Sequence, residues 1–103
     1  MDIFDFRKYI ADNSIQSICF SSESQNYDGA ESLTGLKFNL IFNEFVFLCR
    51  LNTILLKNGD SSIAFENIVS IATIPNTPFL NFFEVKCSKN DCIKSYIIML
   101  RKQ

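Results

Sequence analysis

The stretch NTILLKNGDSSIAFENIVSIATIP, residues 52–75, decides the fold, because it holds three short apolar runs separated by turn residues. Asn58-Gly59 is a strong hairpin signal, since both residue types tolerate the left-handed backbone of a tight turn. Glu66-Asn67 then predicts a bend before a strand over residues 68–74. The prolines of the segment 75–78 end that strand, because proline cannot donate to a sheet ladder.

The register of this hairpin follows from its apolar residues. A two-residue loop at Asn58-Gly59 would set Leu56 opposite Ser61. A four-residue loop over 58–61 instead matches apolar with apolar side chains, which stabilises a strand pair. We favour this second register, which pairs Leu56 with Ile63 and Ile54 with Phe65.

The preceding segments, 36–42 and 45–51, predict another hairpin around Asn43-Glu44. One face of this hairpin is apolar at every position, a match of the kind that fixes register. The pairs on that face are Phe42 with Phe45, Leu40 with Phe47, Phe38 with Cys49, and Leu36 with Leu51. We interpret the phenylalanine row as core and the reverse face as the more informative surface.

Residues 80–88 and 92–101 predict the last hairpin, with Lys89-Asn90 near its turn. A register shifted by one residue would set two lysines, Lys86 and Lys94, side by side and is disfavoured. A C-terminal helix over 91–102 is the competing interpretation, but the β-branched and aromatic residues of 96–98 favour a strand. The favoured register sets Cys87 opposite Cys92 and Phe83 opposite Tyr96.

The N-terminal residues 2–12 have the spacing of a short helix. Asp2 can cap it through its carboxylate, and Ile3, Phe6 and Ile10 would face the core. A strand over 15–22 with Ile18 and Phe20 on one face follows, and then a polar, acidic surface loop over 22–35. The chain is therefore predicted to be a single domain over 1–103. Its fold class is mainly β: an antiparallel meander of about seven or eight short strands forming a small barrel or curled sheet, with one N-terminal helix.

Composition excludes several classes of function. The net charge is −1 and the pI about 5.3, so there is no basic excess to neutralise DNA or an anionic membrane. Asp2 and Asp5 stand where a signal peptide needs positive charge, and no apolar stretch approaches the length of a membrane span. We therefore expect a cytoplasmic protein. Its use of Phe, Ile, Asn and Lys follows AT-rich codons, which indicates an AT-rich bacterial or phage genome.

The sequence predicts no enzyme and no cofactor. It contains no histidine, which excludes Ser-His-Asp and Cys-His catalysis and imidazole metal ligands within the chain. No spacing matches a nucleotide-binding or calcium loop. Four cysteines in a cytosolic chain are expected to be reduced and half-buried rather than a zinc site or a disulfide framework. They are Cys19, Cys49, Cys87 and Cys92.

Several strands carry more apolar surface than one core needs. The runs 45–49 and 96–100 are apolar at every position, whereas a strand with one wet face should alternate. The second face is then covered either by the chain itself or by another chain. Our leading hypothesis is a non-catalytic interaction protein that forms a homodimer or binds a protein partner, one variant being a small phage or mobile-element inhibitor of a host protein. The candidate binding residues lie on the reverse face of the 36–51 hairpin: Lys37, Ile41, Val46, Leu48 and Arg50.

A second hypothesis is a module for a small ligand or single-stranded RNA. Lys37 and Arg50 would lie opposite each other, and two like charges call for an anion nearby. The stretch 52–75 resembles the late strands of Sm-like RNA-binding barrels and of pleckstrin-homology-like sheets, in its polar turn between two apolar strands. The resemblance covers under a quarter of the chain and implies a small β-barrel architecture that binds RNA or a ligand.

Overall fold

A computed structural model describes residues 1–21, 38–74 and 81–102 of the chain. The described part is mainly β, with one N-terminal helix, α1 (Ile3–Asp12), and a short 3-10 turn, η2 (Cys49–Leu51). Within these ranges no helix has the length and apolar character needed to cross a membrane. The strands are β1 (Ser17–Phe20), β2 (Leu40–Phe42), β3 (Glu44–Leu48), β4 (Thr53–Asn58), β5 (Ser61–Phe65), β6 (Ile68–Thr73), β7 (Asn81–Lys89) and β8 (Cys92–Arg101).

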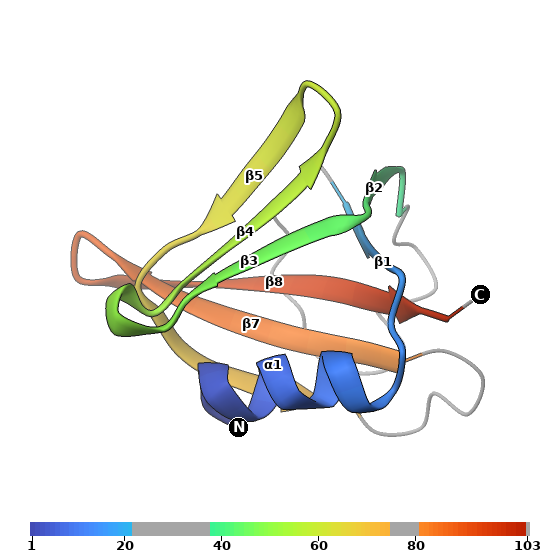
Figure 1. The fold of residues 1–103 in the computed structure, drawn as a ribbon. Coiled ribbons are helices and arrows are strands. Elements are labelled where there is room, and N and C mark those ends of the chain that lie inside the picture. The colour runs from blue at the N-terminus through green and yellow to red at the C-terminus, as the bar shows by residue number, and fades with distance from the viewer. Residues whose placement is uncertain (22–37, 75–80, 103) are drawn as a thin grey trace.

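The strands form two antiparallel sheets that pack around one core (Figure 1). The first, sheet A, has the order β2-β1-β8-β7-β6, and the second, sheet B, has the order β3-β4-β5. Strands next to each other in sequence are therefore neighbours in a sheet at most steps, and β1 pairs with β8 across the length of the chain. The barrel that the sequence suggested is not closed, because β5 and β6 belong to different sheets.

The predicted hairpin around Asn43-Glu44 is wrong. Strand β2 pairs with β1 in sheet A, whereas β3 pairs with β4 in sheet B. At the junction, the Asn43 N–H donates to the Lys57 carbonyl oxygen (3.1 Å) while Glu44 is the register partner of Lys57. Two residues of one strand thus oppose one residue of the other, which is a β-bulge that bends the strand. The chain crosses from one sheet to the other at this bend instead of turning back.

The hairpin of β4 and β5 has the predicted register. Leu56 pairs with Ile63 and Ile54 with Phe65. The strands extend further into the loop than expected, so that Asn58 pairs with Ser61 and only two residues form the turn. Gly59 has a φ of +58° in this turn, a conformation that glycine adopts without a steric penalty.

The last hairpin confirms the C-terminal strand, but neither predicted register is correct. Cys87 pairs with Lys94 and Lys89 with Cys92. The strands are displaced by two residues from the favoured register, so every side chain keeps its face. The turn decides the register: Asn90 and Asp91 both have positive φ, 51° and 63°, the conformation of a tight turn whose twist suits a hairpin.

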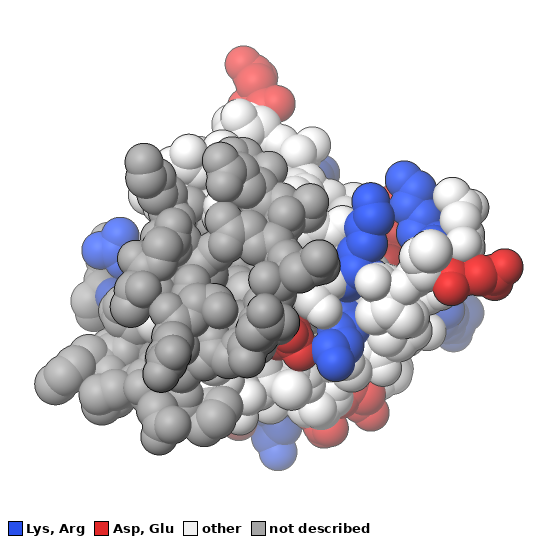
Figure 2. Space-filling view, turned by 180° about the vertical axis from the view of Figure 1, so that it is seen from behind, with Lys and Arg blue, Asp and Glu red and all other residues white. Residues whose placement is uncertain are grey.

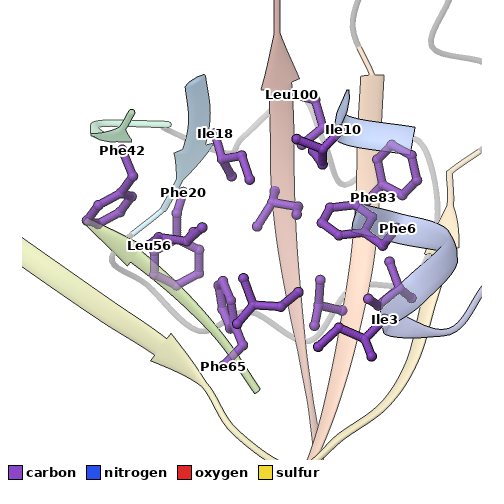
Figure 3. Packing of buried hydrophobic residues seen from close by; sticks show 14 of the residues in the cluster. Ile3, Phe6, Ile10, Ile18, Phe20, Phe42, Leu56, Phe65, Phe83 and Leu100 are labelled. Carbon is purple, nitrogen blue, oxygen red and sulfur yellow. The ribbon is translucent and has the colours of Figure 1, made fainter. Parts of the chain in front are cut away.

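The helix forms as the sequence predicts. Asp2 is the N-cap, and its Oδ1 accepts a hydrogen bond from the Asp5 N–H (2.9 Å). The three predicted core residues, Ile3, Phe6 and Ile10, are buried. The Phe6 ring contacts Phe83 of β7, with ring centroids 5.4 Å apart. Figure 3 shows the helix residues at one end of the core and the rings of Phe20, Phe42 and Phe65 at the other. The helix therefore covers one part of the inner face of sheet A and sheet B covers the other.

The predicted acidic loop 22–35 and the proline-containing segment 75–78 lie outside the described residues, as does Lys37.

Candidate interaction surface and pocket

The four predicted binding residues within the described ranges lie on three different elements. Ile41 lies on β2 in sheet A, Val46 and Leu48 lie on β3 in sheet B, and Arg50 lies in η2. Strands β2 and β3 do not pair with each other, and Lys37 lies outside the described residues, so the ligand site at Lys37 and Arg50 stays a prediction. Val46 and Leu48 alone share a face of one strand, because side chains two residues apart in a strand point the same way.

Val46 belongs to a row of small apolar side chains on the outward face of sheet B. It is the register partner of Leu55, and Leu55 is the partner of Ala64. Val46 is 38% exposed, Ala64 is exposed and Leu55 half-buried. The next row holds Glu44, Lys57 and Ser62, all exposed. The outward face of sheet B is thus an apolar row beside a polar one.

Among the described residues strand β3 is also an edge strand, and apart from the bend at Asn43-Glu44 it has few of the features that usually protect edges. Natural edge strands are blunted by shortness, bulges, lysine, proline or polar residues. Among the described edges, β2 has three residues, β6 carries a register irregularity between Ile68 and Ser70, and β5 begins with two serines. Strand β3 reads EFVFL, with one charged residue at its start. Its core-facing Phe45 and Phe47 remain half-exposed, so the edge is accessible.

Part of the second face of sheet A is buried by the chain itself. Cys19 and Ile97 alternate with the core residues Ile18 and Ile98, so they point away from the core. They are nevertheless only 1% and 4% exposed. The surplus apolar surface of β1 and β8 is therefore not free for a partner at these positions, which leaves sheet B as the more open apolar face.

A pocket of about 750 Å³, which we call the corner pocket, lies where β5 leads into β6. The opposite wall is the end of the β7–β8 hairpin, and Asn52 completes the lining. Lys and Arg side chains gather on the side of the molecule that carries this hairpin end, as Figure 2 shows from behind. The sequence analysis missed this pocket, because its walls come from three segments far apart in the chain.

All four cysteines are free thiols, and the described residues hold no cluster of three or more metal-ligating side chains. Cys87 and Cys92 do not face each other across the hairpin, since Cys87 pairs with Lys94. Burial raises the pKa of the Cys87 thiol from 9.0 to about 11, because desolvation penalises the thiolate. Cys87 is therefore a neutral, apolar wall of the corner pocket at neutral pH rather than a nucleophile.

This shift predicts a loss of stability at high pH. The pKa of Cys87 is higher in the folded protein than in the unfolded chain. The contribution of its neutral thiol to the stability of the fold is therefore complete below pH 9.0 and is lost as the pH rises through about 11. We expect Cys87 to account for a loss of about 2 kcal/mol at pH 11 relative to pH 8. Urea unfolding of wild type and Cys87→Ala at both pH values gives the difference between their free energies of unfolding at each pH. The change in this difference between the two pH values measures the contribution of Cys87. Cys92→Ala, which removes an exposed thiol, should show the wild-type dependence, and an equally steep dependence in Cys87→Ala would contradict the assignment.

No protein-family model matches the chain, and no curated protein or solved structure is significantly similar to it.

Proposed function

We propose that the protein is a non-catalytic interaction module that self-associates through edge strand β3. The observation that carries the proposal is the combination of an unprotected apolar edge with half-exposed Phe45 and Phe47. Such an edge presents unpaired backbone N–H and C=O groups to another strand. A second copy of β3 is a suitable partner, because a two-fold dimer uses the same patch on both subunits.

Antiparallel pairing of two β3 strands about Val46 satisfies the sequence of the strand. Glu44 of each copy then lies opposite Leu48 of the other, so the two acidic residues are apart. Phe45 lies opposite Phe47 on the core-facing side, where the cross-strand aromatic pair is favourable. The two copies of sheet B would form one continuous sheet of six strands, in which the β3 edge of each copy would be paired.

The expected dimer is weak, because a pair of five-residue strands buries less than the roughly 1,600 Å² of a standard interface. We expect a dissociation constant of about 1–100 μM for the dimer. If the partner is a host protein, the same edge of β3 would pair with a strand of that protein. The dependence of the molecular mass on concentration tests the homodimer directly.

Sedimentation velocity or light scattering from about 1 μM to 1 mM tests the proposal. The wild-type mass should rise from 11.8 kDa toward twice that value with concentration. Val46→Lys should remain monomeric, because a lysine at the centre of the strand pair would face the lysine of the other copy.

Ser62→Lys is the matched control, since Ser62 is exposed on the same face of sheet B but on the opposite edge strand, β5. It should dimerise like the wild type. A wild-type protein that stays monomeric at the highest concentration, or equal impairment by both lysine substitutions, refutes the use of β3.

A further inference from the structure

The corner pocket is a preformed concavity rather than a loose gap. The Ile68 N–H donates to the Asn52 carbonyl oxygen (2.9 Å), and the Ser88 N–H donates to the Asn67 carbonyl oxygen (3.0 Å). These two backbone hydrogen bonds tie the β5–β6 corner to the start of β4 and to the β7–β8 hairpin. The walls therefore keep their positions without a ligand, which lowers the ordering cost of binding.

The floor of the pocket is aromatic. Phe65 and Tyr96 line it with ring centroids 5.4 Å apart. Phe65 is buried whereas Tyr96 is half-buried, so part of the tyrosine ring faces the pocket. Beside them, the neutral thiol of Cys87 adds another apolar surface. Because Phe65 and Cys87 are 2% and 7% exposed, a flat apolar group can pack against the exposed part of the Tyr96 ring.

Two lysines stand over that floor. Residues at alternate positions of β7 and β8 face the core, and on this face the residues from Phe83 to Cys87 and from Tyr96 to Leu100 are apolar. Beyond them, Lys89 and Lys94 occupy the same face at the hairpin end and line the pocket. They are the only charged side chains on this face among the described residues of the hairpin.

Among the described residues, these lysines have no carboxylate partner. Within the described ranges, the ion pair of the hairpin joins Lys86 to Glu84 (3.6 Å) on the opposite face. Glu66 and Asp91 also line the pocket, but neither lies within 4.0 Å of a lysine ammonium. Two cations beside an apolar floor are complementary to a ligand that brings its own negative charge.

We propose that the corner pocket binds a small organic anion with an aromatic ring system. The anionic group would lie at Lys89 and Lys94, and the ring would pack on the exposed part of Tyr96, whose own ring contacts Phe65. A volume of about 750 Å³ lies in the range of small-molecule sites. This site is separate from β3 and does not depend on self-association.

Two fluorescent probes of the same shape test the proposal. The first is 8-anilinonaphthalene-1-sulfonate, which carries the charge, and the second is N-phenyl-1-naphthylamine, which lacks it. We expect saturable binding of one sulfonate probe per chain, at least about tenfold tighter than the uncharged probe, since hydrogen bonds to charged groups are stronger than those between neutral groups. Displacement by 1-naphthoate or by 1-naphthyl phosphate then shows which anion fits, and displacement by neither overturns the proposal.

Substitutions locate the probe. Lys94→Gln should weaken binding of the sulfonate about tenfold and leave the uncharged probe unchanged. Lys86→Gln removes a lysine from the other face of the same hairpin and should change neither. Equal affinities for the two probes, or equal effects of the two lysine substitutions, overturn the proposal. Val46→Lys should bind the sulfonate as wild type does, so failure of the β3 dimer and failure of the pocket are distinguishable.

Discussion

Phe6→Ala is expected to reduce the free energy of unfolding by about 3–5 kcal/mol. Phe6 is 0% exposed, and its ring lies edge-on to two other rings. The centroid distances are 5.4 Å to Phe83 of sheet A and 6.3 Å to Phe47 of sheet B. Truncation at this position removes the side chain that joins helix α1 to both sheets. It also leaves a cavity that rigid neighbours cannot fill.

Thermal and urea unfolding measure this effect, and we expect the melting temperature to fall by more than about 10 °C. Phe4→Ala is the matched control, because Phe4 lies on the same helix but is 61% exposed. Its effect should stay within about 0.5 kcal/mol. Comparable losses in both variants would show that α1 does not dock on the sheets through Phe6.

Phe65→Ala is expected to cost a similar 3–5 kcal/mol. Phe65 forms a triangle of rings with Phe20 and Tyr96, with centroid distances of 5.4–5.8 Å. Phe65 belongs to sheet B and the other two to sheet A, so this cluster holds the two sheets together. Loss of the ring removes both apolar burial and the contacts with the two neighbouring rings, edge-on to Phe20 and tilted to Tyr96, which add about 0.5–1.5 kcal/mol per pair.

The control for Phe65→Ala is Leu51→Ala, because Leu51 is an apolar residue that is 65% exposed in η2. Urea unfolding should place Leu51→Ala within about 0.5 kcal/mol of wild type. Unfolding of Phe65→Ala should remain cooperative, because Phe6 of α1 still contacts both sheets. If Phe65→Ala were as stable as Leu51→Ala, the ring cluster would not join the sheets.

Local sequence signals predicted the structure correctly where the deciding contacts lie within one helix or one hairpin. The capping carboxylate of Asp2 and the helical spacing of Ile3, Phe6 and Ile10 predicted α1 and its buried face. The β4–β5 register followed from its apolar cross-strand pairs, although the turn is shorter than the predicted four-residue loop. In both cases the deciding contacts lie within about a dozen residues, where chain connectivity leaves few alternatives.

The wrong register of the β7–β8 hairpin has a specific cause. A displacement of two residues keeps every side chain on its face, so the apolar pattern cannot distinguish the two registers. The backbone of Asn90-Asp91 does distinguish them, because both residues adopt left-handed conformations in the turn. Asn and Asp are the residue types that tolerate this conformation, so that signal was present in the sequence.

The candidate surfaces differ in how far the sequence points to them. Val46 and Leu48 were predicted because β3 is apolar on both faces, and they stay candidates. Lys89 and Lys94 were not predicted, because a pocket formed by a hairpin end, a strand corner and Asn52 has no signature within any one segment.

The sequence by itself determined the β-rich class, the N-terminal helix, most strands and the β4–β5 register, because these follow from local pattern and turn chemistry. Only the tertiary structure decided that the phenylalanine-rich segments β2 and β3 separate into two sheets. Face matching within 36–51 satisfied the apolar residues equally well, but pairing of β2 with β1 and of β3 with β4 buries Phe42, Ile54 and Leu56 together. That choice depends on contacts between distant segments, and it places β3 on an edge and opens the corner pocket.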